Sequence, residues 1–153
     1  MDIKFFKPTT KDITSMQNLV KGEVESGVIL LRTEDEMATT IRSYTCVNVN
    51  GVLAGFTALH IHSPRLAEVR SLVVNAKFRG LKLGQQLVEA CKKEANVLEL
   101  EEILSLTYEK GFFESLGFTE IKKEELPEHK IWADCIRCKH FPVCDEVALI
   151  YKL

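Results

Sequence analysis

The first residues of the chain show a strand pattern followed by a helical one. Residues 3–7 form a short run that is typical of a strand. Between Thr9 and Gly27 the apolar side chains recur at helical spacing, which predicts a first helix. The residues on the apolar face of this helix are Ile13, Met16, Leu19, Val20 and Val24. The chain is therefore expected to open with one strand and one amphipathic helix.

An apolar connector and a second helix follow. Residues 28–32 lie between the two helices and are expected to be extended or a loop. Thr33 and Glu36 have the spacing of a capping box, in which each side chain binds the backbone N–H of the other residue. The apolar residues that this second helix is predicted to carry are Met37, Ile41 and Tyr44.

The middle of the chain has a β pattern. Residues 45–49 and 52–61 are rich in β-forming residues, and the Asn-Gly pair between them is a strong hairpin signal because both turn positions tolerate positive φ. Residues 67–74 read as another strand. From residue 83 to residue 97 the apolar side chains return to the helical period, so a glycine-containing turn joins this strand to a helix.

The last third of the chain completes an α+β pattern. Residues 102–107 read as a strand, residues 111–116 as a short helix that stops at Gly117, and the next strand begins at Phe118. Residues 147–151 supply a final strand. The order β-α-α-β-β-β-α-β-α-β-β predicts one mixed, largely antiparallel sheet flanked by helices.

Composition fits one soluble globular domain, residues 1–153, in which residues 122–145 form an irregular, cysteine-rich segment. The net charge of −2 gives no electrostatic reason to expect nucleic acid or an anionic membrane as a partner. The N-terminus is too charged for a signal sequence, and no long apolar stretch exists, so we expect a cytoplasmic protein. Five cysteines in such a chain indicate reduced thiols rather than disulfides.

The turn between the strand at 67–74 and the following helix has the chemistry of an anion site. Gly80 and Gly84 allow a tight backbone path, and the helix start presents N–H groups and the positive end of its dipole. Arg79 or Lys82 would add positive charge. Taken alone, this pattern is more often ordinary turn chemistry than a phosphate site.

Residues 73–84 resemble motif A of the GNAT acetyltransferases, Arg/Gln-x-x-Gly-x-Gly/Ala, and residues 112–118 are similar to the aromatic-rich helix ending in Leu-Gly-Phe of that family. The resemblance implies a GNAT fold with splayed central strands and acetyl-CoA as cosubstrate. The loop that would hold the pyrophosphate consists of Arg79, Gly80, Leu81, Lys82, Leu83 and Gly84. The strand residues whose backbone would pair with the pantetheine arm are Leu72, Val73 and Val74.

One residue of the loop departs from the family pattern. Lys82 stands where the motif has its first glycine. The lysine either replaces close backbone approach with a charge or points to solvent as a neutral change. The departure puts the strength of cofactor binding in doubt.

The resemblance also implies direct attack of an amine on the thioester, without a covalent enzyme intermediate. Such an attack needs a base near the point where the two central strands separate. Glu68, early in the predicted strand 67–74, is the candidate base. The alternative interpretation is that Glu68 is a solvated glutamate at the end of a strand. Family members often protonate the leaving thiolate with a tyrosine of the short helix, where this chain has Phe113. Tyr108 is the nearest substitute, and its alternative is a half-buried core tyrosine.

A narrower resemblance concerns the acceptor. The chain resembles the short, single-domain N-acetylglutamate synthases in several segments. These segments are residues 29–33, 67–72, 106–108 and 112–118 and a tail from Glu125 to Glu146. The resemblance implies acetylation of the α-amino group of an amino acid, L-glutamate first, in arginine biosynthesis. The long synthases carry an amino-acid-kinase-like regulatory domain, which we do not expect in a chain of 153 residues, nor arginine feedback through it.

Two arginines suit a dicarboxylate acceptor. Arg32, in the connector between the helices, and Arg70, on the cofactor strand, can each bind a carboxylate through two N–H groups. Arg70 has a surface charge as its alternative. The two arginines favour an acidic small molecule over a cationic one.

Other functions stay open. The acceptor could instead be another small amine or a protein N-terminus. The chain could also be a GNAT-like domain that binds acetyl-CoA without catalysing a reaction. Homodimers are frequent in the family, so the resemblance also allows a homodimer. A zinc site is conceivable, although its spacing matches no standard finger and no metal is needed for the chemistry. Its candidate ligands are Cys135, Cys138, His140 and Cys144. The alternative is that this segment is a loop of reduced thiols without a metal.

Overall fold

The computed structural model describes residues 1–26, 32–122, 125 and 146–153. Its elements up to the first hairpin are β1 (Ile3–Phe6), α1 (Ile13–Ser26), α2 (Glu34–Thr39), β2 (Tyr44–Val49) and β3 (Val52–Ile61). The remaining elements are β4 (Leu66–Val74), α3 (Leu83–Val97), β5 (Glu102–Thr107), α4 (Lys110–Ser115), β6 (Thr119–Ile121) and β7 (Val147–Lys152). Short 3₁₀ turns precede α1, β2 and the loop before α3.

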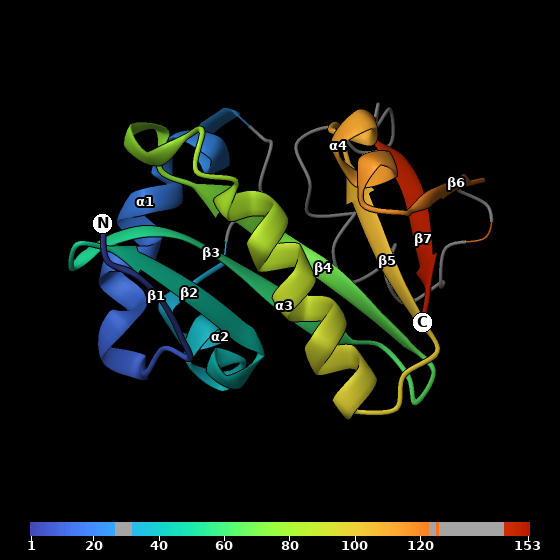
Figure 1. The fold of residues 1–153 in the computed structure, drawn as a ribbon. Coiled ribbons are helices and arrows are strands. Elements are labelled where there is room, and N and C mark those ends of the chain that lie inside the picture. The colour runs from blue at the N-terminus through green and yellow to red at the C-terminus, as the bar shows by residue number, and fades with distance from the viewer. Residues whose placement is uncertain (27–31, 123–124, 126–145) are drawn as a thin grey trace.

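The strands form one seven-stranded sheet in the order β1-β2-β3-β4-β5-β7-β6. Among the strand pairs of the described residues, β4 with β5 is parallel and the others are antiparallel. The predicted α+β architecture with a mixed, largely antiparallel sheet is confirmed. Figure 1 shows α3 crossing one face of the sheet diagonally, with α1 and α2 at the N-terminal half.

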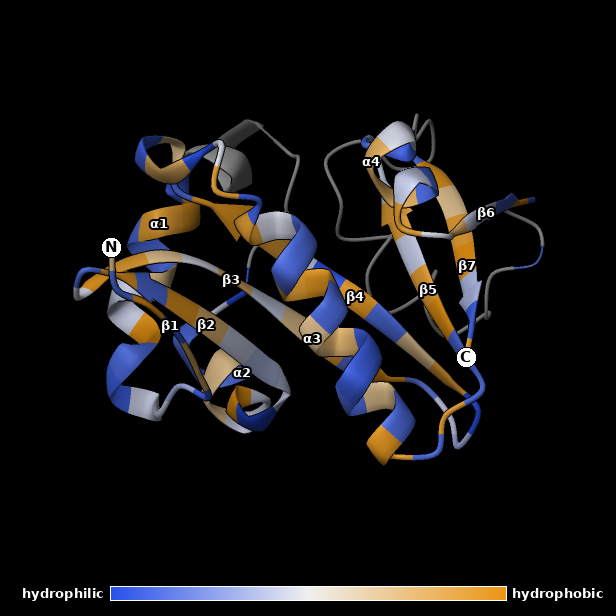
Figure 2. Cartoon of the chain, viewed as in Figure 1, coloured by the Kyte–Doolittle hydropathy of each residue, from blue (hydrophilic) through white to orange (hydrophobic). Residues whose placement is uncertain are grey.

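Two layers of core lie on the two faces of the sheet. On one face, α1 and α2 pack on β2 and β3, and the buried residues there include Met16, Met37 and Phe56. On the other face, α3 packs on β3 and β4 through residues such as Leu87 and Val88. Figure 2 shows hydrophobic and hydrophilic residues alternating along α3, as expected of a helix with one buried face.

Local sequence signals account for several element ends. The β2–β3 turn has positive φ at both Asn50 and Gly51, as the Asn-Gly pair predicts. The capping box at the start of α2 is formed, with Glu36 N–H donating to the Thr33 hydroxyl at 3.1 Å. Gly117 has φ of +94° and ends α4 in a Schellman motif, in which Phe118 N–H donates to the Phe113 carbonyl at 3.1 Å.

The predicted second helix was too long. It ends at Thr39, a 3₁₀ turn contains Ile41, and Tyr44 is the first residue of β2, paired with Ala58. The physical reason lies in the threonines that follow Met37. The hydroxyls of Thr39 and Thr40 both donate to the Glu36 carbonyl, at 2.9 and 2.8 Å, and such local bonds compete with helix propagation.

The centre of the sheet is interrupted between β4 and β5. Their pairing runs from Leu66 with Glu102 to Val69 with Ser105 and stops there. Beyond that point the two strands diverge, which is visible in Figure 1 as a V that opens away from the C-terminus. We call this opening the splay. No helix among the described residues has the length and apolar character needed to cross a membrane.

Candidate active site

A β-bulge in β4 lies directly beyond the start of the splay. The β3–β4 register shifts between Phe56 and Ala58, so that Ser71 and Leu72 together face Thr57. Ser71 has φ of +54°, and the Thr57 hydroxyl donates to the Arg70 carbonyl at 3.0 Å. The bulge interrupts the regular β3–β4 pairing just beyond Val69, the last β4 residue that pairs with β5.

The three strand residues predicted to pair with pantetheine follow this bulge. Val73 is buried against the α1 side, whereas Leu72 and Val74 are half-buried toward α3. Gly55 pairs with Val74, and a Cβ added at Gly55 would lie 2.5 Å from the Val73 carbonyl oxygen. The backbone of β3 therefore approaches β4 too closely there for any side chain.

The 79–84 loop connects the end of β4 to α3. A 3₁₀ turn capped by the side chain of Asn75 leads into it, and Gly80 has φ of +94°. The first N–H groups of α3, at Leu83 and Gly84, have no partner inside the helix and lie at the positive end of its dipole. Arg79 is exposed beside them. The loop thus has the geometry of an anion site.

Lys82 adopts the left-handed conformation, with φ of 58° and ψ of 32°. This explains why the motif has a glycine at this place, since glycine reaches that region without steric cost. The Gln86 side chain donates to the carbonyls of Leu81 and Lys82, at 3.0 and 3.3 Å, and so braces the loop. Lys82 is exposed, and its side chain makes no cap for α3.

The second signature lies against the first. A Cβ at Gly84 would meet the ring of Phe112 at 3.4 Å and Val74 at 3.7 Å, so the start of α3, the end of β4 and α4 meet here. Phe113 is buried and makes edge contacts with Phe112 and Phe118. Its ring is part of the core, where a phenylalanine fits because it has no hydroxyl that would need a hydrogen-bond partner.

Tyr108 lies between the end of β5 and α4, on the arm of the splay opposite β4. Its exposed fraction is 38%. The side chain is therefore partly covered by the protein and partly open to solvent, so both interpretations of Tyr108 stay predictions.

Glu68 is at the base of the splay and only 3% exposed. The alternative interpretation as a solvated strand-end glutamate is wrong, because β4 is a central strand and Glu68 pairs with His60 on one side and Leu104 on the other. Its Oε1 lies 2.8 Å from Nε2 of His62, and both side chains are buried. His62 did not stand out in the sequence, because only the β3–β4 register brings it to Glu68.

Arg32 and Arg70 lie close to the same side chain. Tyr44, Ala58 and Arg70 are cross-strand neighbours on β2, β3 and β4, and therefore share the α1/α2 face of the sheet. Burial raises the pKa of the Tyr44 hydroxyl, while the positive charges of Arg32 and Arg70 act in the opposite direction. The two arginines predicted for the acceptor thus both act electrostatically on one buried tyrosine, which the sequence had assigned to a helix. We call these three residues the arginine–tyrosine cluster.

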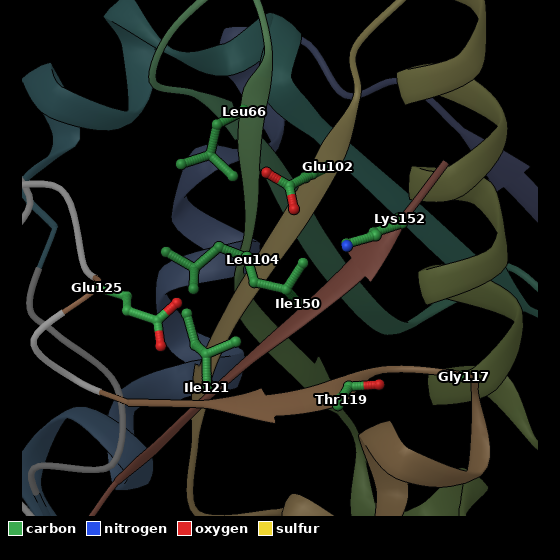
Figure 3. Close-up of a pocket in the computed structure, with 9 residues that line it drawn as sticks. All are labelled: Leu66, Glu102, Leu104, Gly117, Thr119, Ile121, Glu125, Ile150 and Lys152. Atoms are coloured by element: carbon green, nitrogen blue, oxygen red, sulfur yellow. The ribbon is translucent and has the colours of Figure 1, made fainter.

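A further pocket of about 590 Å³ is lined by residues of β4, β5, β6 and β7, and none of its lining residues belongs to the 79–84 loop. Figure 3 shows Leu104, Ile121 and Ile150 forming its apolar floor, with charged side chains at its edges. Its lining residues are Leu66, Glu102, Leu104, Gly117, Thr119, Ile121, Glu125, Ile150 and Lys152. Leu66 lies two residues before Glu68 on β4, and Leu104 pairs with Glu68 from β5, so the pocket begins beside the strand that carries the carboxylate.

The cysteines divide into two groups. Cys46 and Cys91 are buried, and burial raises the pKa of each thiol to about 12, so neither has the character of a nucleophile. The predicted zinc candidates Cys135, Cys138, His140 and Cys144 lie outside the described residues.

Comparison with known proteins identifies the family. Residues 41–120 match the acetyltransferase (GNAT) domain. An uncharacterised N-acetyltransferase of Chlorobaculum tepidum is 32% identical over 93% of this chain and 91% of its own length. An amino-acid acetyltransferase of Haemophilus ducreyi is 28% identical over 80% of this chain, but the match spans only 28% of that longer protein.

Solved structures show the same fold. N-acetylglutamate synthase from Neisseria gonorrhoeae, complexed with coenzyme A and N-acetyl-glutamate, superimposes with a TM-score of 0.87 at 20% identity, over 100% of this chain and 35% of that one. A Mycobacterium tuberculosis protein in complex with CoA gives a TM-score of 0.83 at 19% identity, over 98% and 99% of the two chains.

The family domain covers just over half of the chain, and it includes the splay, the 79–84 loop and the short aromatic helix. The expected cosubstrate is confirmed with it. The chain belongs to the GNAT acetyltransferase family and is an acetyl-CoA-dependent N-acetyltransferase.

Proposed function

We propose that this enzyme transfers the acetyl group of acetyl-CoA to the α-amino group of an acidic amino acid, with L-glutamate as the preferred acceptor. The observation that carries the proposal is the arginine–tyrosine cluster, which gathers Arg32 and Arg70 on the same sheet face as the buried Glu68. A site with two cations and one buried carboxylate suits an acceptor that has two carboxylates and one amine.

In this proposal the cofactor lies across the splay. The 79–84 loop binds the pyrophosphate through backbone N–H groups and through Arg79. The pantetheine arm pairs with the backbone of Leu72, Val73 and Val74, which lie beyond the last β4 residue that pairs with β5. Backbone N–H groups at the bulge then polarise the thioester carbonyl as negative charge develops on its oxygen.

The chemistry is a direct attack of the amine on the thioester carbon. As the C–N bond forms and the C–S bond breaks, the amine proton passes to Glu68, directly or through one water. Tyr108, at the opposite arm of the splay, protonates the departing thiolate. Tyr108 then regains a proton from water, and Glu68 releases the amine proton to water, so that both groups return to their starting states. No covalent enzyme intermediate is needed, and the high pKa of the Cys46 and Cys91 thiols is consistent with that route.

The comparisons support an amino-acid acceptor. The Haemophilus ducreyi relative is named an amino-acid acetyltransferase, and the Neisseria gonorrhoeae structure has N-acetyl-glutamate bound. Acetylation of glutamate by this enzyme would belong to arginine biosynthesis. The positive charge of Arg32 and Arg70 also argues against a polyamine acceptor, since like charges repel.

Removing either arginine tests the acceptor assignment. Arg32→Ala and Arg70→Ala should each raise KM for L-glutamate by about tenfold to a hundredfold, because each loses charged hydrogen bonds to a carboxylate. KM for acetyl-CoA should stay unchanged. Arg65→Ala, which removes an exposed arginine from the β3–β4 hairpin turn, is the matched control and should leave both KM values unchanged. A loss of acetyl-CoA affinity in Arg32→Ala or Arg70→Ala would contradict the assignment.

A further inference from the structure

We propose that His62 is a positioning residue for Glu68, which holds the carboxylate at the base of the splay in the orientation that accepts the amine proton. The inference rests on the proposed role of Glu68 as the base. It adds a second residue to proton transfer, contributed by the turn that follows β3.

The backbone fixes His62 where it can act. His62 N–H donates to the Leu66 carbonyl at 2.9 Å, and the Ser63 hydroxyl accepts from the N–H groups of Arg65 and Leu66 at 3.2 and 3.1 Å. The turn is therefore closed by several hydrogen bonds. His62 is two residues beyond His60, the register partner of Glu68, so it approaches the carboxylate along the diagonal of the strand pair.

The contact between His62 and Glu68 is buried, which makes it stronger than the same contact would be in water. The side chains of His62 and Glu68 are 3% and 4% exposed, and their Nε2 and Oε1 atoms are 2.8 Å apart. A carboxylate removed from water needs hydrogen-bond donors to stay charged. The proposed base is the charged carboxylate, whose oxygens only accept, so the proposal assigns the proton of this bond to Nε2 of His62. The bond also restricts rotation of the carboxylate, which decides where its oxygens point.

His60 shares this environment, since its ring meets the His62 ring edge to face with centroids 4.8 Å apart. This contact limits the tilt of the His62 ring. The proton path itself is simple: the amine loses one proton to Glu68 as the C–N bond forms, His62 keeps its own N–H, and Glu68 returns the proton to water after the product leaves.

A purely structural role predicts a different outcome from a positioning role, so a double-mutant cycle separates them. The single variants are His62→Leu, which removes the donor, His62→Gln, which keeps an amide donor at similar reach, and Glu68→Gln. The double variant combines His62→Leu with Glu68→Gln. Cys91→Ala, on the opposite face of the sheet, is the control for a general loss of packing.

His62→Leu should lower kcat with L-glutamate by about tenfold to a hundredfold, with KM for acetyl-CoA unchanged, because the base is misplaced but the cofactor site is intact. His62→Gln should recover most of that loss. In the Glu68→Gln background, His62→Leu should cost little more, since there is no base left to position. Cys91→Ala should keep its kcat at a temperature where it is folded.

An unchanged kcat in His62→Leu, or equal losses in both backgrounds, would overturn the positioning role while leaving Glu68 as the base. Full turnover in Glu68→Gln would remove the base assignment itself, and this inference with it. If His62→Leu does not fold, as judged by circular dichroism, His62→Asn replaces it, because its shorter amide does not reach Glu68. The same expectations and contradictions then apply to His62→Asn.

Discussion

Lys82 stands where the family motif has a glycine, and it adopts the backbone conformation that favours glycine. Its backbone has φ of 58° in a loop where the motif has glycine, and its side chain is exposed. A left-handed conformation costs a residue with a Cβ roughly 1–2 kcal/mol. The cofactor loop is therefore preserved in shape but carries strain that a glycine would not have.

Lys82→Gly should raise the free energy of unfolding by about 1 kcal/mol, because the relief of the left-handed strain outweighs the greater chain entropy of glycine. Urea denaturation measures the change. Lys82→Ala keeps the Cβ and is the matched control, for which no such gain is expected. Equal or lower stability of Lys82→Gly would show that Lys82 is not strained in solution.

The buried thiols give a prediction about pH. Burial raises the pKa of Cys46 and Cys91 to about 12, above the value of roughly 8.5 for a free thiol. Their stabilising contribution is therefore complete below about pH 8.5 and is lost progressively as pH rises toward the folded-state value, because the unfolded chain loses these protons first.

Urea denaturation between pH 7 and pH 10 should show a fall in stability at the alkaline end that is smaller in the double variant Cys46→Ala, Cys91→Ala. Cys46 and Cys91 should also stay unreactive toward a thiol reagent at pH 8 until the protein is unfolded. Rapid modification of either thiol in the folded protein would contradict this account of the core.

At the scale of elements, the bulge in β4 and the close approach of β3 shape the cofactor site. Thr57 satisfies the Arg70 carbonyl that the bulge releases from the ladder. Gly55 lets the neighbouring strand lie against Val73. The splay therefore depends on β3 as much as on β4 and β5.

Gly55→Ala should destabilise the protein by about 1–3 kcal/mol and weaken CoA binding, because a Cβ 2.5 Å from the Val73 carbonyl oxygen forces β3 and β4 apart. Thermal unfolding and calorimetric titration with CoA measure the two effects. Gly111→Ala, in α4 with nothing within 4 Å of the added Cβ, should be as stable as the parent or slightly more so. Normal stability and CoA affinity in Gly55→Ala would show that the close approach is not needed.

Elements with local signals could be predicted from the sequence. The capping box at Thr33, the Asn-Gly turn and the helix stop at Gly117 each depend on residues a few positions apart. The end of α2 was mistaken because the hydroxyls of Thr39 and Thr40 override an apolar period that continues to Tyr44. Side-chain bonds to the backbone are invisible to a periodicity argument.

The site was predictable to a smaller extent, because its parts meet only through strand register. Glu68, Arg32 and Arg70 could be named one by one from the family resemblance. The placement of Glu68, Arg70 and Tyr44 on one face, with His62 on the carboxylate, follows from the pairing of β2, β3 and β4. That pairing is a long-range property which single-sequence patterns do not specify.

At the scale of the whole molecule, the sheet brings two distant signatures together. Phe112 of α4 lies beside Gly84 at the start of α3. Lys92 of α3 donates to the Leu116 carbonyl at the end of α4, at 2.6 Å, and lies over the Tyr151 ring at 4.0 Å. These contacts join the two arms of the splay through α3, so that the cofactor loop and Tyr108 belong to one packed unit.

The most direct test of the proposed function is a competition for acetyl groups. The purified protein is given isotope-labelled acetyl-CoA with an equimolar mixture of the proteinogenic amino acids, spermine and a short peptide with a free N-terminus, and the products are identified by mass spectrometry. Labelled N-acetylglutamate should be the dominant product. Label mainly on spermine or the peptide, or CoA binding without any acetylated acceptor, would contradict the proposal.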